Sequence, residues 1–86
     1  MTFSVLFNTQ AHKSIKKLDN QSKDRIKKKI VKLQEDPFPP DCVRVEEYKQ
    51  EKIFRVRVGN YRILYLVRYE MQQILIVKID KRGRVY

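Results

Sequence analysis

The chain has few of the residues on which metal, disulfide or histidine chemistry depends. Cys42 is its only cysteine, His12 is its only histidine, and tryptophan is absent. A single cysteine excludes an intramolecular disulfide and a cysteine metal cage, and it is consistent with a reducing cytoplasm. His12 stands among lysines near an expected helix start, where an isolated histidine is typically a surface residue. A histidine-based mechanism would have no second imidazole to use.

Acidic residues are also scarce, with 10 Asp and Glu against 20 Lys and Arg, which gives a formal net charge of +10. No two carboxylates stand in a recognisable metal-binding motif, and Glu35-Asp36 and Glu46-Glu47 are simply adjacent. Because two-metal nucleases need several converging carboxylates, we expect no metal and no other cofactor. The positive excess favours a nucleic-acid partner. An acidic protein partner is the alternative, and the two are compatible.

Long apolar runs are missing as well. None approaches the roughly 20 residues of a membrane span, and residues 1–7 are too short for the core of a signal peptide. The 86 residues suit one small domain, residues 1–86, and 42% apolar composition argues for a folded chain. We therefore expect a cytoplasmic, single-domain protein.

Residue periodicity predicts an α+β fold. Alternation predicts an N-terminal strand over 2–7, and helical spacing predicts two helices, from 8 or 9 to 18 and from 21 to 36, that form an αα-hairpin. Pro37, Pro39 and Pro40 end the second helix. Four further strands are expected in a mainly antiparallel sheet, at about 42–48, 53–58, 61–69 and 74–79, with a polar connection at 49–52. The nearly continuous apolar strand 74–79 should lie at or near the centre. The helices should cover the apolar face of this sheet.

The most informative segment is 53–65, which predicts a β-hairpin closed by Gly59-Asn60. A two-residue loop sets Val58 opposite Tyr61 and Arg57 opposite Arg62. One face is then apolar and belongs to the core: Phe54, Val56, Val58, Tyr61, Ile63 and Tyr65. The other face carries Arg55, Arg57, Arg62 and Leu64.

The opposed arginines predict an anion. Directly facing like charges destabilise a sheet by up to about 1 kcal/mol, so the Arg57/Arg62 pair indicates a phosphate bound between two guanidinium groups. Structural pairing with Glu46, Glu47 or Glu51 is the alternative for one of the arginines.

The C-terminal segment extends this basic cluster. Residues 80–86 supply Arg82, Arg84 and Tyr86 after a strand expected beside the hairpin, so they can fold over the same face. A frayed basic tail is the alternative. The helix lysines are more typical of a solvated surface that steers nucleic acid toward the protein.

The arginine hairpin and the tail resemble the RelE/ParE toxins of toxin–antitoxin systems, and most of all archaeal RelE. The resemblance rests on Phe54-Arg55-Val56-Arg57, Gly59-Asn60-Tyr61-Arg62-Ile63-Leu64-Tyr65 and Lys81-Arg82-Gly83-Arg84-Val85-Tyr86. RelE and ParE share the Gly-Asn-Tyr-Arg segment, whereas the tail favours RelE. This likeness implies a ribosome-dependent endoribonuclease that cuts messenger RNA without a metal, and a RelB-like antitoxin partner. A ParE-like gyrase inhibitor and a noncatalytic basic RNA- or protein-binding module are the alternatives.

The resemblance also implies roles for individual residues. Arg55, Arg57, Arg62, Arg82 and Tyr86 match the catalytic positions, and Lys52, Lys81 and Arg84 are expected to bind RNA phosphates. Arginine rarely gives up a proton, so the arginines are expected to stabilise the charged phosphorane, with Tyr86 as the base if positive charge lowers its pKa. The acid stays open among Lys81, Arg82 and a ribosomal group.

Overall fold

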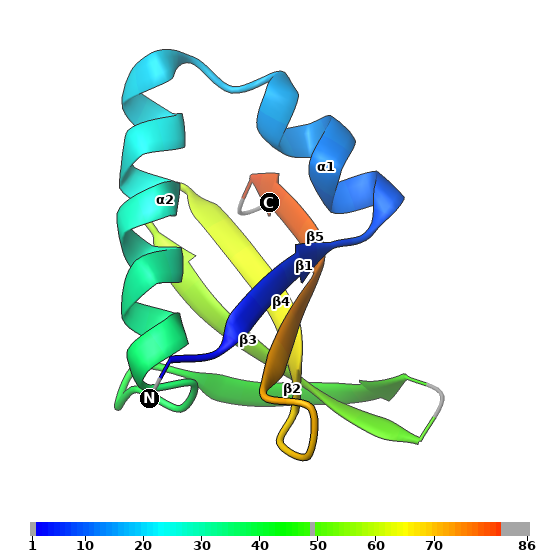
Figure 1. The fold of residues 1–86 in the computed structure, drawn as a ribbon. Coiled ribbons are helices and arrows are strands. Elements are labelled where there is room, and N and C mark those ends of the chain that lie inside the picture. The colour runs from blue at the N-terminus through cyan, green and yellow to red at the C-terminus, as the bar shows by residue number, and fades with distance from the viewer. Residues whose placement is uncertain (1, 49, 82–86) are drawn as a thin grey trace.

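The computed structural model describes residues 2–48 and 50–81, with the backbone alone for 46–48. Its elements follow the predicted order (Figure 1). They are β1 (Ser4–Phe7), α1 (Thr9–Lys16), α2 (Asn20–Glu35), β2 (Val43–Tyr48), β3 (Glu51–Val58), β4 (Tyr61–Arg68) and β5 (Gln73–Lys81). Within the described residues, no helix is both long and apolar enough to cross a membrane.

All the described strands join one sheet in the order β1-β5-β4-β3-β2. Neighbours pair antiparallel except β1, which runs parallel to β5. The sequence predicted a four-stranded sheet after a separate N-terminal strand, and the structure corrects this to five strands. β5 is apolar on much of both faces and takes β1 as its second neighbour, so it lies one strand in from the edge.

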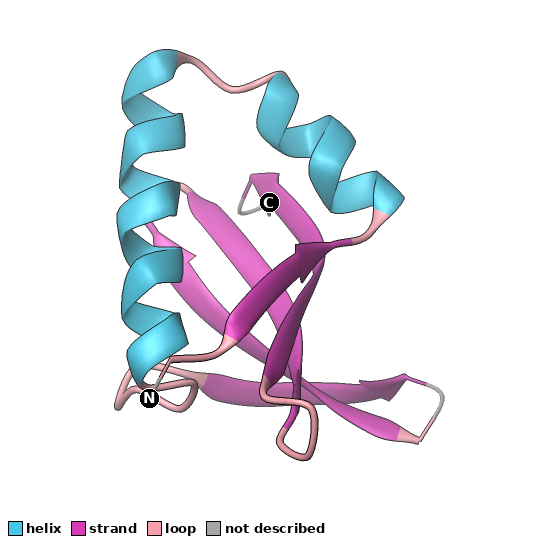
Figure 2. Ribbon diagram, viewed as in Figure 1, coloured by secondary structure: helices cyan, strands magenta, loops and turns pink. Residues whose placement is uncertain are grey.

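Both helices cover the same side of the sheet, and the β2–β3 hairpin extends away from them (Figure 2). The Asn8 side chain caps α1 by accepting a 2.9 Å hydrogen bond from the Ala11 backbone N–H. α1 lies against β5, and α2 lies against β1 and β3. Ala11 from α1 and Ile26, Ile30 and Leu33 from α2 are buried, as predicted for the helix faces turned to the sheet.

The hairpin prediction is confirmed residue by residue. Val58 faces Tyr61, Arg57 faces Arg62, Val56 faces Ile63 and Phe54 faces Tyr65. Val56, Ile63 and Tyr65 are fully buried under the helices, while Phe54, Val58 and Tyr61 pack around them. The apolar face of the hairpin therefore forms the sheet side of the hydrophobic core, against which the helices pack.

One expected connection is instead strand. Glu51 and Lys52 begin β3 and pair with Tyr48 and Glu47, although residues 49–52 were predicted as a polar link. The positive φ of Gln50, 68°, turns the chain between the two strands. A tight turn lengthens the hairpin, and polar side chains are no obstacle to pairing on a solvent-facing edge.

Candidate functional site

The arginine face is the side of the sheet turned away from the helices, with Arg55 and Arg57 on β3, Arg62 on β4 and Lys78 on β5. Arg57 lies directly opposite Arg62, and Arg55 lies opposite Leu64, which in turn faces Lys78. The structure thus brings the three predicted hairpin arginines together on one face. Lys78 was not predicted, and only its register beside Leu64 reveals it.

Arg62 has an internal partner that the sequence analysis missed. Asp80 on β5 stands opposite it, and the carboxylate accepts hydrogen bonds from Arg62 Nε at 2.9 Å and Nη2 at 3.0 Å. A carboxylate of the protein itself thus lies beside the Arg57/Arg62 pair. The opposed arginines therefore do not require a phosphate to explain them, and phosphate binding by this pair stays a prediction.

The contact between Asp80 and Arg62 changes the pKa of both side chains. Hydrogen bonding to Arg62 holds the pKa of Asp80 below its ordinary value, and the same contact raises the pKa of Arg62. Lys78 Nζ lies 3.6 Å from Asp80 Oδ2 and adds to the effect. Asp80 is consequently ionised at neutral pH and offsets part of the positive charge of the arginine face.

Arg55 is different, because its Nε is buried and has no hydrogen-bond partner within the part of the chain that the structure describes. A buried donor without a partner costs about 1–3 kcal/mol, so its presence in a folded protein needs an explanation. Of the three predicted alternative partners, Glu51 binds Arg68 at 3.2 and 3.3 Å, whereas the side chains of Glu46 and Glu47 lie outside the described part of the chain, so pairing with them stays a prediction. Arg55 is thus the strongest candidate for an anion ligand on this face.

The face also has an apolar end. Ile53 and Leu66, which precede and follow the arginines on the same side of β3 and β4, are only 3% and 2% exposed. This end of the face is therefore closed to solvent. The accessible part of the face begins at Arg55 and runs toward the Gly59-Asn60 turn.

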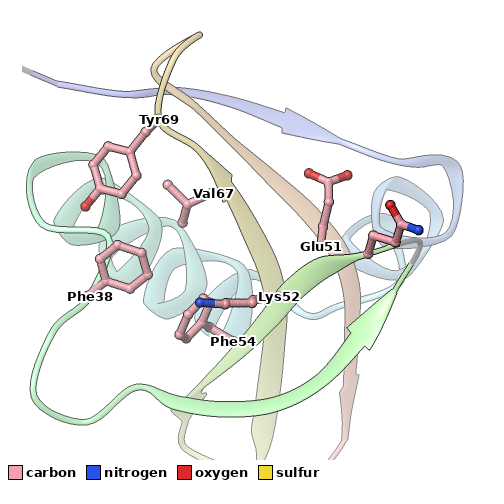
Figure 3. Close-up of a pocket in the computed structure, with 7 residues that line it drawn as sticks. Phe38, Glu51, Lys52, Phe54, Val67 and Tyr69 are labelled. Carbon is pink, nitrogen blue, oxygen red and sulfur yellow. The ribbon is translucent and has the colours of Figure 1, made fainter.

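The predicted phosphate-binding lysines lie elsewhere on the molecule. Lys52 shares the alternation of Phe54, so it projects from the helix side of the sheet and lines a cavity of about 370 Å³ with Phe38, Phe54 and Tyr69 (Figure 3). Lys81 ends β5 opposite Tyr61, with its Nζ 6.0 Å from the centre of that ring. Both lysines thus lie on the helix side of the sheet, although Lys81 directly follows Asp80 of the arginine face in the chain.

The remaining predicted site residues, Arg82, Arg84 and Tyr86, lie outside the described residues. The strand that leads to them is where it was expected, because β5 pairs with β4 and brings Asp80 and Lys81 beside Arg62 and Tyr61. β5 therefore ends at Lys81, next to the start of β4.

The fold is that of small α+β toxins of the RelE type. The structure matches RelE in the archaeal RelE–RelB complex from Pyrococcus horikoshii with a TM-score of 0.84, at 28% identity over 99% of this chain and 100% of that one. It also matches the RelB–RelE antitoxin–toxin complex from Methanococcus jannaschii with a TM-score of 0.67, at 26% identity over 90% of this chain and 89% of that chain.

Sequence comparison gives the family. The family model described as the ParE toxin of the type II toxin–antitoxin system parDE matches residues 5–86, so the chain belongs to this toxin family within the RelE/ParE superfamily. The chain is 29% identical to the putative toxin RelE1 of Methanocaldococcus jannaschii, over 100% of this chain and 97% of the relative. It is 26% identical to the mRNA interferase toxin RelE of Escherichia coli, over 98% of this chain and 87% of that protein.

Proposed function

We propose that this toxin is a ribosome-dependent endoribonuclease that cuts messenger RNA without a metal and so stops translation in the cytoplasm. The observation that carries the proposal is Arg55, whose buried Nε has no hydrogen-bond partner among the described residues, on the same face as Arg57 and Arg62. Guanidinium groups match phosphate oxygens with two parallel hydrogen bonds and do not lose their charge. Relatives of this chain are named mRNA interferases, which supports the same substrate.

The chemistry fits a phosphate linkage that is attacked from within the RNA. The 2′-hydroxyl of the nucleotide attacks the neighbouring phosphorus, the bond to the 5′-oxygen of the next nucleotide breaks, and the products are a 2′,3′-cyclic phosphate and a 5′-hydroxyl. Arg55, Arg57 and Arg62 stabilise the additional negative charge on the phosphorane. Removal of any one of these guanidinium groups should lower the rate on the order of 10²-fold.

Proton transfer is assigned to the tail. Tyr86 serves as the base, and Arg82 adds positive charge that lowers the barrier to ionising the phenol. Lys81, Arg82 or a ribosomal group supplies the proton to the leaving oxygen, and Arg84 holds a flanking phosphate. Because these catalytic groups are few, the reaction needs a substrate that is already oriented. We therefore expect little cleavage of free RNA and efficient cleavage on the ribosome.

We further propose that a RelB-like antitoxin neutralises the toxin by covering this cationic surface. The solved complexes of relatives pair RelE with RelB, and the net charge of +10 favours an acidic partner. Binding should therefore weaken as salt rises, since part of the attraction is between exposed charges.

Primer extension on messenger RNA in a translating extract tests the nuclease function. Cuts that depend on ribosomes and follow the codon phase are expected with the unmodified toxin. They should fall on the order of 10²-fold with Arg55→Ala. Lys23→Ala, a change on the helix side of the molecule, is the matched control and should leave the cuts intact.

The alternative is inhibition of DNA gyrase, which the ParE description of the matching family favours. A supercoiling assay with purified gyrase separates the two functions. Loss of supercoiling without any RNA cleavage would replace the nuclease proposal by the gyrase one.

A further inference from the structure

Asp80 contacts Arg62 in a way that fixes the orientation of its guanidinium group. The two carboxylate oxygens take separate donors, Oδ1 from Nε at 2.9 Å and Oδ2 from Nη2 at 3.0 Å. Two parallel hydrogen bonds define the plane of the guanidinium as well as its position. A single contact would leave the side chain free to rotate about its terminal bonds.

The same contact leaves the other edge of Arg62 available. The bonds to Asp80 do not use Nη1, and the Arg62 side chain is 37% exposed. The unused N–H groups can still donate to a phosphate oxygen. Asp80 thus holds one edge of the guanidinium and leaves a second edge for a ligand.

The Arg62–Asp80 pair contributes little to the stability of the fold. Both partners are partly exposed, with Asp80 28% exposed, and solvent-screened ion pairs contribute at most about 1 kcal/mol. Placing Asp80 opposite Arg62 also needs an irregular register, because the β4–β5 pairing shifts between Leu64 and Tyr65. The fold thus accepts a bulge in its sheet at the point that sets the partner of Arg62.

We propose that Asp80 is a positioning residue that presents Arg62 to the RNA phosphate. This inference rests on the proposed nuclease function and deepens it. Arg62 lies opposite Arg57 on the face that also carries Arg55, so a fixed Arg62 guanidinium is already oriented on the face of the other two arginines before RNA arrives. Ordering the site before the substrate binds lowers the activation barrier.

A positioning role and a purely inhibitory role of Asp80 predict opposite changes in kcat when the carboxylate is removed. If Asp80 only masked the charge of Arg62, its removal would strengthen RNA binding and speed cleavage. If Asp80 positions Arg62, its removal makes the face more positive and leaves KM equal or lower, but kcat falls because Arg62 is no longer oriented. The direction of the change in kcat therefore decides between them.

The chain contains a closely matched control. Arg68 and Glu51 form a second two-point pair on the same face, at 3.3 and 3.2 Å, with side chains 38% and 36% exposed. Glu51→Gln removes the same charge from a comparable pair, away from the three arginines. Any effect of net charge on RNA binding should be equal in Glu51→Gln and Asp80→Asn.

The experiment measures kcat and KM for cleavage of messenger RNA programmed on ribosomes. We expect Asp80→Asn to lower kcat about 10- to 100-fold without raising KM, while Glu51→Gln keeps the kcat of the unmodified toxin. In an Arg62→Lys background, Asp80→Asn should change kcat less than about two-fold, because its effect passes through Arg62. An unchanged or higher kcat in Asp80→Asn, or a full loss retained in the Arg62→Lys background, overturns the inference.

A second readout needs neither RNA nor ribosomes. The Arg62 Nε–H signal in an NMR spectrum should exchange slowly in the unmodified protein and in Glu51→Gln, and rapidly in Asp80→Asn. Slow exchange in Asp80→Asn would show that Arg62 is held without Asp80 and would overturn the inference. If Asp80→Asn does not fold, Asp80→Glu keeps the charge, displaces the carboxylate and should show the same kcat loss. If the unmodified toxin cuts no RNA on ribosomes, the proposed function is contradicted. If the unmodified toxin and Asp80→Asn cut RNA with the same kcat, only the role of Asp80 is contradicted.

Discussion

Tyr65 donates a 2.6 Å hydrogen bond from its hydroxyl group to the carbonyl oxygen of Pro37, and its side chain is completely buried. The bond ties the segment after α2 to the central strand β4. Burial raises the pKa of Tyr65, so its hydroxyl stays protonated and can donate across the physiological pH range.

Tyr65→Phe should therefore destabilise the fold by about 1–3 kcal/mol, because it leaves the Pro37 carbonyl without its buried donor. Urea unfolding followed by circular dichroism measures the loss. Tyr69→Phe is the control, since Tyr69 is 60% exposed and its change should stay within about 0.5 kcal/mol. Equal losses in the two variants would assign the effect to something other than the buried bond.

Gly59 should not tolerate a side chain. Its φ of 57° lies in the left-handed region, and a Cβ there would lie 3.2 Å from Nη1 of Arg25 on α2. Gly59→Ala should cost about 1 kcal/mol or more in the free energy of unfolding. A Gly59→Ala/Arg25→Ala double variant should recover only the part due to the close contact, and full recovery would show that backbone conformation is unimportant here.

The Arg62–Asp80 pair should make stability depend on acid pH. The pKa of Asp80 is lower in the folded protein than its ordinary value of 3.8, so the pair stabilises the fold above that pH and the gain is lost as pH falls through the folded pKa. The stability difference between the unmodified protein and Asp80→Asn should be constant near neutral pH and shrink in strong acid. A difference that grows with acid would contradict the assigned ionisation.

Replacing Arg55 should lower the cleavage rate without lowering the free energy of unfolding. Arg55→Met keeps an apolar stem and removes a buried donor that has no hydrogen-bond partner among the described residues, so the free energy of unfolding should stay equal or rise. Cleavage on ribosomes should fall on the order of 10²-fold. A large stability loss with normal cleavage would identify Arg55 as structural.

Lys52 should affect RNA binding and leave the cleavage step unchanged, because it lies away from the arginine face, in the aromatic-lined cavity on the helix side of the sheet. As a phosphate contact away from the cut, Lys52→Ala should raise KM and lessen its salt dependence while kcat stays the same. A reduced kcat with unchanged KM would place Lys52 in the reaction itself.

Local pattern was sufficient for most of the fold. Alternation over 53–58 and the Gly59-Asn60 turn determined the hairpin register, because a two-residue loop permits only one pairing of the flanking strands and one face must be buried. The spacing of Ile26, Ile30 and Leu33 likewise determined which side of α2 is buried. The grouping of Arg55, Arg57 and Arg62 on one face followed directly from that register.

The partners of those arginines depended on contacts between strands that are distant in sequence. A regular β4–β5 pairing continued from Arg68 and Gln73 would set Arg62 opposite Ile79, and the shift between Leu64 and Tyr65 moves it opposite Asp80. The sequence by itself determined the hairpin and its cationic face, because both depend on neighbours along the chain. Tertiary structure alone decided that Asp80 binds Arg62 while Arg55 Nε has no partner in the described part, because one bulged residue changes which side chains meet across the sheet.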